Sequence, residues 1–303
     1  MIDRLITNIK KTENPTVVGL DPTLEMIPEQ LASEMFETHG KTPKAVASMF
    51  LEFNKQIIDQ TYDLIPAVKP QIAMYEQYGI PGLEVYIETI KYAKSKGLVV
   101  IGDIKRGDIA STATAYSAHI GLTDIEGEKF DIWGSDVVTI NPYMGYDAIE
   151  PFIDNCNKLD KGLFVLVKTS NPKGGQIQDL LVGDEKVYEK VAKLVSGWGE
   201  EAMGELGYSK IGAVVGATYP EEAAQIRKLM PHTYFLVPGY GAQGADAEKL
   251  QGCFNKDGLG AIVNSSRGII AAYKNNKDYQ GMDFAQASRE AVIAMKKDLQ
   301  SII

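Results

Sequence analysis

The stretch LVVIGDIK, residues 98–105, decides the fold. It is a run of apolar and β-branched residues that ends in two charged residues, Asp103 and Lys105. A strand that is apolar along most of its length is buried on both faces, as in a parallel sheet covered by helices. The stretch therefore predicts a buried parallel strand with charged side chains at its carboxyl end.

Seven further runs have the same character, and helical patterns lie between most of them. The eight predicted strands are TVVGLD (16–21), IPAVKPQIAMYE (65–76), LVVIGDIK (98–105), DVVTINPY (136–143), LFVLVKTS (163–170), IGAVVGATY (211–219), TYFLVPGYG (233–241) and AIVNSSRGI (261–269). The clearest helical patterns cover residues 45–64, 82–97, 186–207 and 220–230, and several are closed by glycine.

Eight repeated strand–helix units predict an α/β fold, a single (β/α)8 barrel domain over residues 1–303. The alternative is a doubly wound open sheet. That fold usually carries a GxGxxG turn after its first strand, whereas here the first strand continues into GLDPTLE (19–25). No Pro- or Ser-rich linker, internal repeat or low-complexity stretch divides the chain.

The composition narrows the function classes. The chain has 303 residues, a formal charge of −9 and no basic run, which argues against general nucleic-acid binding. No stretch approaches the about 20 apolar residues of a membrane span, and the first residues lack the apolar core of a signal peptide. Cys156 and Cys253 lie far apart and suggest neither a disulfide framework nor a zinc site. We therefore expect a cytoplasmic protein with no membrane or nucleic-acid partner.

Polar residues at the predicted strand ends are the candidate site, because a barrel places its chemistry at the carboxyl rim of the strands. In chain order they are Asp21, Lys69, Asp103 with Lys105, Asn141, Thr169 with Ser170, Thr218 and Arg267. Asp103 and Lys105 are two apart, so in a regular strand they face the same side, which is the lumen. Burying an unpaired charge costs several kcal/mol, so we expect these groups to pair with each other and with Lys69. A buried structural ion pair is the alternative, but such a pair needs only one charge of each sign.

A second group of residues is typical of a phosphate site. VPGYGAQGAD (237–246) follows the seventh strand and VNSSRGI (263–269) contains the eighth, where barrels commonly bind phosphate. Glycines allow close approach of the backbone, Gln243 offers a neutral amide and Arg267 a bidentate guanidinium.

Together these residues resemble the orotidine 5'-phosphate decarboxylase family, in particular its longer bacterial subgroup. The resemblance is carried by Asp103-x-Lys105-x-x-Asp108, Asp21 in GLDP, Lys69 in VKPQIAMYEQYG, Ser170 in KTSNP, the PGYGAQG loop and Arg267. It spans roughly residues 16–270. It implies removal of carbon dioxide from orotidine monophosphate, giving UMP, with no metal or organic cofactor.

The resemblance also implies roles for single residues. Lys105 is the proton donor to the pyrimidine carbon that loses its carboxylate, and Asp103 lies beside the departing group. Lys69 completes the charge array and contacts the ribose. Asp108 reaches the neighbouring subunit's site, which implies a homodimer.

The remaining positions of the resemblance hold the substrate. They are Asp21 at a ribose hydroxyl, Thr112 across the subunit interface, Ser170 at the pyrimidine, and Pro238, Tyr240, Gln243 and Arg267 in the segments that hold the phosphate.

Two segments depart from the compact form of the family, and three other functions stay open. Arg106 is interpreted as a solvated charge rather than a ligand contact, and the 171–190 segment is longer than a minimal loop. A related sugar-phosphate decarboxylase or synthase would bind magnesium. A Schiff-base aldolase would use Lys69 or Lys105 as its nucleophile. A catalytically silent nucleotide-binding regulator would bind without turnover.

Overall fold

The structure, a computed structural model, describes residues 1–216, 220–241, 247–276, 278–279 and 281–303. Eight parallel strands close into a barrel in the order β1-β12-β11-β10-β7-β6-β3-β2. They are β1 (Thr16–Leu20), β2 (Ala67–Pro70), β3 (Val99–Arg106), β6 (Val137–Ile140), β7 (Gly162–Lys168), β10 (Ile211–Val215), β11 (Phe235–Pro238) and β12 (Ala261–Ser265). The predicted single-domain (β/α)8 barrel is confirmed.

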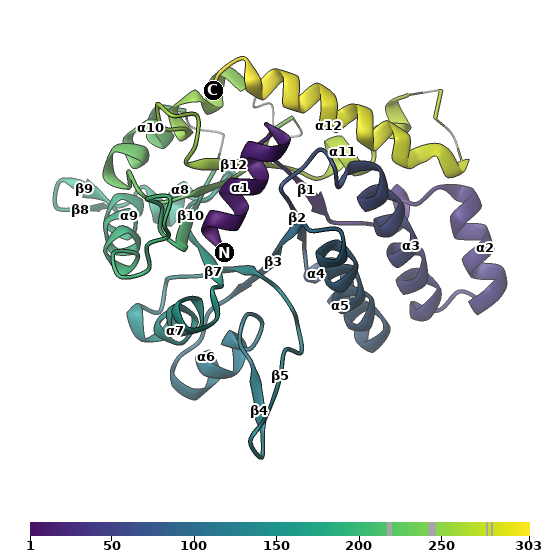
Figure 1. Cartoon of the computed structure of the whole chain (residues 1–303), viewed down its shortest axis with the longest axis horizontal. Coiled ribbons are helices and arrows are strands. Elements are labelled where there is room, and N and C mark those ends of the chain that lie inside the picture. The colour runs from purple at the N-terminus through teal and green to yellow at the C-terminus, as the bar shows by residue number, and fades with distance from the viewer. Residues whose placement is uncertain (217–219, 242–246, 277, 280) are drawn as a thin grey trace.

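Helices surround the barrel (Figure 1). They are α1 (Ile2–Thr12), α2 (Glu29–His39), α3 (Pro43–Thr61), α4 (Ala73–Glu76), α5 (Gly79–Ser95), α6 (Ala110–Ser117), α7 (Glu150–Leu159), α8 (Gly175–Gln178), α9 (Val187–Trp198), α10 (Pro220–Leu229), α11 (Arg267–Ile270) and α12 (Phe284–Gln300). The start of α3 shows why such helices begin where they do. Thr42 accepts a hydrogen bond from the Ala45 amide at 3.3 Å, and Pro43 occupies the first turn, where its missing N–H costs nothing.

Two short hairpins project from the barrel (Figure 1). One joins β4 (Thr123–Ile125) to β5 (Glu128–Phe130), and the other joins β8 (Leu181–Val182) to β9 (Glu185–Lys186). Short 3-10 helices cover Leu24–Met26, Tyr146–Ala148, Ala247–Cys253, Ala272–Asn275 and Gly281–Asp283.

The apolar residues form two cores, as a barrel requires. The larger lies between the strands and the outer helices. The smaller fills the lumen and includes Ile2, Leu5 and Ile6 of α1 packed with strand residues such as Val17 and Ile101. Helix α1 thus closes the amino end of the barrel, and the carboxyl end is left for a site.

Two predicted elements differ most in extent from those of the structure. The predicted strand 65–76 ends at Pro70, and residues 73–76 form α4. The predicted helix 186–207 ends at Trp198, after which Met203 and Ser209 form an isolated bridge. The apolar run after Pro70 continues because Ile72 and Tyr75 are buried, whereas residues 199–207 contain no such run.

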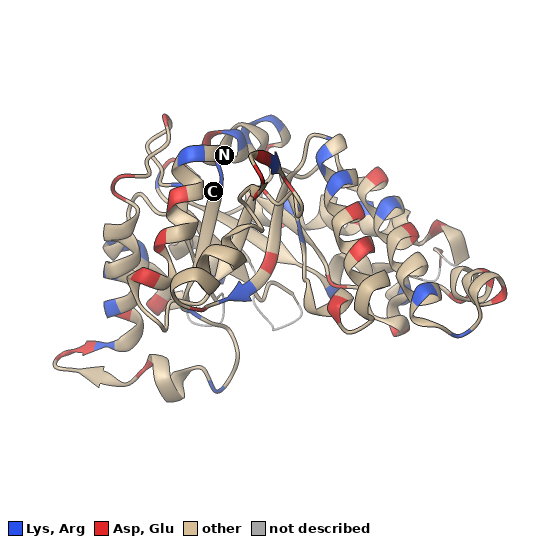
Figure 2. Ribbon diagram, turned by 90° about the horizontal axis from the view of Figure 1, so that it is seen from below, with Lys and Arg blue, Asp and Glu red and all other residues tan. Residues whose placement is uncertain are grey.

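No helix in the described part of the chain is long and apolar enough to cross a membrane. Acidic and basic residues are interspersed over the outer helices in the view of Figure 2.

Candidate active site

A cavity of about 710 Å³ opens at the carboxyl ends of the strands. Eight of the eleven predicted site residues line it: Asp21, Lys69, Asp103, Lys105, Ser170, Pro238, Tyr240 and Arg267. These residues lie at the ends of six different strands, so closure of the barrel brings them together. Gln243, and Thr218 among the polar residues predicted at strand ends, lie outside the described residues.

Asp103 is the centre of the polar end of this cavity. Its Oδ2 accepts hydrogen bonds from Lys69 Nζ at 2.8 Å and from Gln71 Nε2 at 3.0 Å. Its Oδ1 accepts from Lys105 Nζ at 2.5 Å and from Thr139 Oγ1 at 2.7 Å. Four donors converge on one carboxylate that is only 5% exposed, which fixes its position.

The charges alternate through this array. Lys69 lies between Asp103 and Asp21, with its Nζ 3.7 Å from Asp21 Oδ1. Burial alone lowers the pKa of Lys69, but the two carboxylates outweigh it and raise the pKa to about 12. Burial alone raises the pKa of Asp103, but Lys69 and Lys105 hold it well below its usual range. Both groups are therefore charged at neutral pH.

Lys105 has an unusual backbone conformation. Its φ is 45°, in the left-handed region that a lysine rarely adopts, and the register of β3 against β6 shifts between Gly102 and Arg106. Its amide donates to Thr139 Oγ1 at 3.1 Å. The prediction that Lys105 lies beside Asp103 is confirmed, but the simple alternation used to derive it does not hold over this bulge. Strain of this kind is often found at functional residues.

Near Asp21 the cavity contains oxygen atoms that accept no hydrogen bond within the described residues. Ser266 Oγ donates to Asp21 Oδ2 at 2.7 Å, and Asn264 Nδ2 donates to Ser266 Oγ at 3.3 Å. Within the described residues, the Oδ1 atoms of Asp21 and Asn264 are buried and have no hydrogen-bond partner. Both residues line the cavity, so these oxygens are available to hydroxyl donors of a ligand.

The segments after β11 and β12, the two strands that lie next to β1 on one side of the barrel, have features suited to an anion. Gly239 and Gly241 have φ values of 104° and 75°, which only glycine adopts without strain. Arg267 is exposed and is the first residue of α11, rather than part of the eighth strand as predicted, because β12 ends at Ser265. The Tyr240 hydroxyl donates to Asp298 of α12 at 2.6 Å.

Asp108 and Thr112 do not line the cavity of their own chain, and Thr112 is exposed on α6. Their contact with a neighbouring subunit's site stays a prediction. Two other residues differ from expectation. Asn141 lies outside the cavity, since β6 ends at Ile140 and Thr139 is the residue that faces it. Arg106 is not a solvated charge. Its guanidinium pairs with Glu76.

Several cavity residues were not predicted from the sequence. The polar ones are Gln71, Thr139, Asn171, Asn264, Ser265 and Ser266. Gln71 is two residues after Lys69, and this spacing is the one signal that could have indicated it. Thr139 and Asn264 lie inside apolar strands and resemble ordinary strand residues there.

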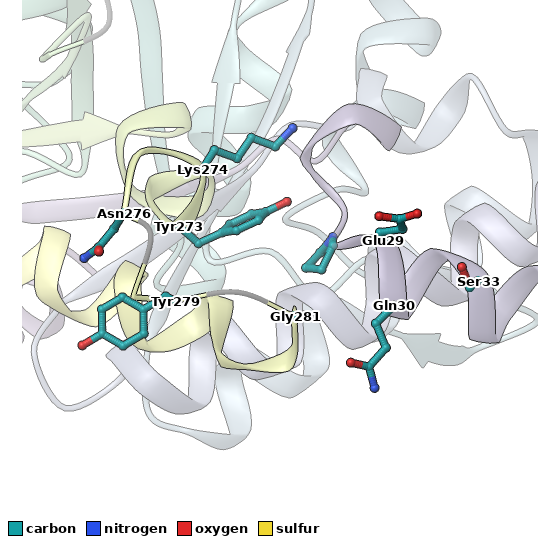
Figure 3. A pocket seen from close by; sticks show the side chains of 9 residues that line it. Glu29, Gln30, Ser33, Tyr273, Lys274, Asn276, Tyr279 and Gly281 are labelled. Atoms are coloured by element: carbon teal, nitrogen blue, oxygen red, sulfur yellow. The ribbon is translucent and has the colours of Figure 1, made fainter.

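A second cavity, of about 620 Å³, lies away from the strand ends. Figure 3 shows its side chains coming from the start of α2 on one side and from residues 273–281 on the other. None of the predicted site residues lines it, so it is not the candidate active site.

Comparison with known proteins agrees with this geometry. The family model described as "Orotidine 5'-phosphate decarboxylase / HUMPS family" matches residues 16–282. The chain is 46% identical to an orotidine 5'-phosphate decarboxylase of Petrotoga mobilis over 99% of this chain and 98% of that protein. It is 44% identical to that of Rhodopirellula baltica over 96% of each.

A solved structure of a related protein has the same fold. A putative orotidine-monophosphate-decarboxylase from Toxoplasma gondii superposes with a TM-score of 0.78 at 31% identity, covering 98% of both chains. From the match over most of its length and from these identities, the chain belongs to the orotidine 5'-phosphate decarboxylase / HUMPS family.

Proposed function

We propose that the chain decarboxylates orotidine 5'-phosphate to UMP without a cofactor, in the cavity at the carboxyl rim, with Lys105 as the proton donor. The observation that carries this proposal is the array of Lys105, Asp103, Lys69 and Asp21, in which opposite charges alternate around the buried pair of Asp103 and Lys69. The names of the relatives support the substrate.

The array suits a reaction that creates a carbanion. The bond between the ring carbon and the carboxylate breaks, carbon dioxide leaves, and the electron pair stays on the carbon. A proton of the Lys105 ammonium then moves to that carbon. A fixed ammonium stabilises the developing charge before it delivers the proton, and the array requires little reorganisation because its hydrogen bonds are already made. Repulsion between Asp103 and the substrate carboxylate is a disputed contribution, so we assign the rate to stabilisation of the transition state.

The other residues bind the rest of the nucleotide. Asp21 accepts from a ribose hydroxyl and Ser170 contacts the pyrimidine. Arg267 holds the phosphate with the loop that contains Pro238 and Tyr240. Phosphate binding far from the reacting carbon supplies energy that orders the site around it.

The active unit in this proposal is a homodimer in the cytoplasm. Asp108 and Thr112 lie outside their own cavity, and Ile109 between them is 50% exposed. An exposed apolar side chain next to two polar residues that follow the catalytic strand fits a contact with a second subunit.

The direct test is to follow the absorbance loss of orotidine monophosphate with purified protein in EDTA. Turnover in EDTA supports the proposal. Activity lost in EDTA and restored by magnesium would favour a related sugar-phosphate enzyme instead. A covalent adduct trapped by borohydride would favour a Schiff-base aldolase.

A further inference from the structure

We propose that Lys168, the last residue of β7, is a positioning residue that anchors residues 169–171 at the cavity. It acts through four charged side chains, called the rim cluster below, which are Lys168, Asp179, Lys186 and Glu222. This inference rests on the proposed function of the cavity.

The rim cluster is compact and balanced in charge. Lys168 Nζ pairs with Asp179 and lies 3.2 Å from Glu222 Oε2. Lys186 Nζ lies 2.9 Å from Glu222 Oε1 and 3.9 Å from Asp179 Oδ1. Both amines lie over the ring of Tyr188, at 4.7 Å and 5.4 Å from its centroid. Two ammonium groups thus face two carboxylates above one aromatic ring.

Lys168 is the only buried member of the rim cluster. The Lys168 side chain is 2% exposed, whereas the other three are 21–38% exposed. A buried ammonium strongly favours the conformations that keep its carboxylates close, because an unpaired buried charge is costly. Lys168 therefore holds the more exposed members in place.

The cluster ties three elements to the barrel. Asp179 follows α8, Lys186 belongs to β9 and Glu222 belongs to α10. The segment 171–186 leaves the rim shortly after Lys168, and the cluster holds it at Asp179, near its middle, and at Lys186, its last residue.

Apolar packing holds this segment only weakly. Helix α8 has no buried residue, and Leu180, Leu181 and Val182 are 56%, 69% and 53% exposed. The position of the segment therefore depends mainly on its polar contacts.

Those contacts reach the cavity through Thr169. Gln178 Oε1 accepts from the Thr169 amide at 3.1 Å, and Gln178 Nε2 donates to Thr169 Oγ1 at 2.7 Å. On the other side Gly216 packs closely, because a Cβ there would lie 2.9 Å from the Ser170 Cα. Thr169, Ser170 and Asn171 all line the cavity. The rim cluster thus sets where these three residues meet the substrate.

The test compares Lys168→Met with Lys168→Arg, which keeps the charge. In Lys168→Met we expect kcat/KM for orotidine monophosphate to fall about 10- to 100-fold, the loss typical of a displacement near 1 Å. Lys168→Arg should recover most of that loss. The matched control is Lys193→Met. It breaks an ion pair to Glu185 of the same hairpin, but Lys193 is 51% exposed and does not line the cavity. It should leave kcat/KM unchanged.

Hydrogen exchange of residues 171–186 gives a readout that does not need activity. Exchange should be faster in Lys168→Met and in Asp179→Asn than in the wild type or in Lys193→Met. The double variant Lys168→Met/Asp179→Asn should lose no more kcat/KM than Lys168→Met alone, since both changes break the same network of ion pairs.

The two proposals can fail separately. Wild-type kcat/KM in folded Lys168→Met, or unchanged exchange of the segment, would refute the positioning role. A wild-type protein with no turnover would refute the proposed function, while the exchange experiment would still show whether Lys168 holds the segment. If Lys168→Met does not fold, Asp179→Asn carries the same test.

Discussion

Replacing Asp103 by asparagine should destabilise the protein as well as inactivate it. The change keeps the shape of the side chain and removes its charge, leaving Lys69 with only Asp21 at 3.7 Å. Lys69 is 4% exposed, so its ammonium cannot regain full hydration. Breaking a buried pair costs about 3–5 kcal/mol, and because Asp21 remains we expect the lower end, about 3 kcal/mol. For a chain of this size that is a melting temperature lower by roughly 5 °C.

The assay is urea unfolding followed by circular dichroism, on four proteins. They are the wild type, Asp103→Asn, Lys69→Met and the double variant. The double variant should be more stable than the sum of the single losses predicts, because no unpaired buried charge remains from the pair. Asp63→Asn is the control, since Asp63 pairs with Arg289 at the surface and its loss should cost at most about 1 kcal/mol. Additive losses, or an Asp103→Asn protein as stable as the wild type, would refute the reasoning.

Three further predictions follow from the same site. Arg267→Ala should lower kcat/KM for orotidine monophosphate roughly 10- to 100-fold, and phosphite should partly restore turnover of the nucleoside that lacks phosphate; wild-type kcat/KM would place the phosphate elsewhere. Equal amounts of Lys105→Ala and Asp108→Asn, allowed to exchange subunits, should regain roughly a quarter of wild-type sites, and no recovery would mean that Asp108 serves its own chain. The pKa of Asp103 is depressed in the folded protein, so its stabilisation is present above its unfolded pKa of about 3.9 and is lost as pH falls through the folded pKa. The difference in unfolding free energy between the wild type and Asp103→Asn should therefore be constant from about pH 5 to pH 9, and a change near neutral pH would contradict the assignment.

The barrel itself could be predicted because its strands are nearly continuous apolar runs. Their lumen residues, such as Ile101, and their outward residues, such as Val100, are both buried, so the runs stand out from the polar helices between them. Strand ends were predicted less well. Residues 73–75 are apolar because α4 packs on the core through Tyr75, and periodicity over so few residues does not distinguish a helical turn from a strand.

The charged residues of the site could also be predicted, because a charge at the end of an apolar strand stands out from the run before it and is costly to bury without a partner. The neutral polar residues of the site could not be predicted from the sequence. Thr139 and Asn264 are compatible with an ordinary strand, and only closure of the barrel shows that they face the cavity. Lys168 ends an apolar strand too, but its role could not be predicted from the sequence. That role depends on Asp179, which follows α8, and on Glu222 of α10, and only the fold brings these two residues to Lys168.

The most direct test of the central claim is the turnover of orotidine monophosphate by Lys105→Ala and by the wild type, both shown to be folded, in EDTA. We expect the wild type to release carbon dioxide and form UMP, and the variant to lose at least about three orders of magnitude in kcat, because it lacks both the proton donor and the ammonium beside the carbanion. A folded Lys105→Ala protein with near wild-type kcat would contradict the claim that the charged array around Asp103 performs the reaction.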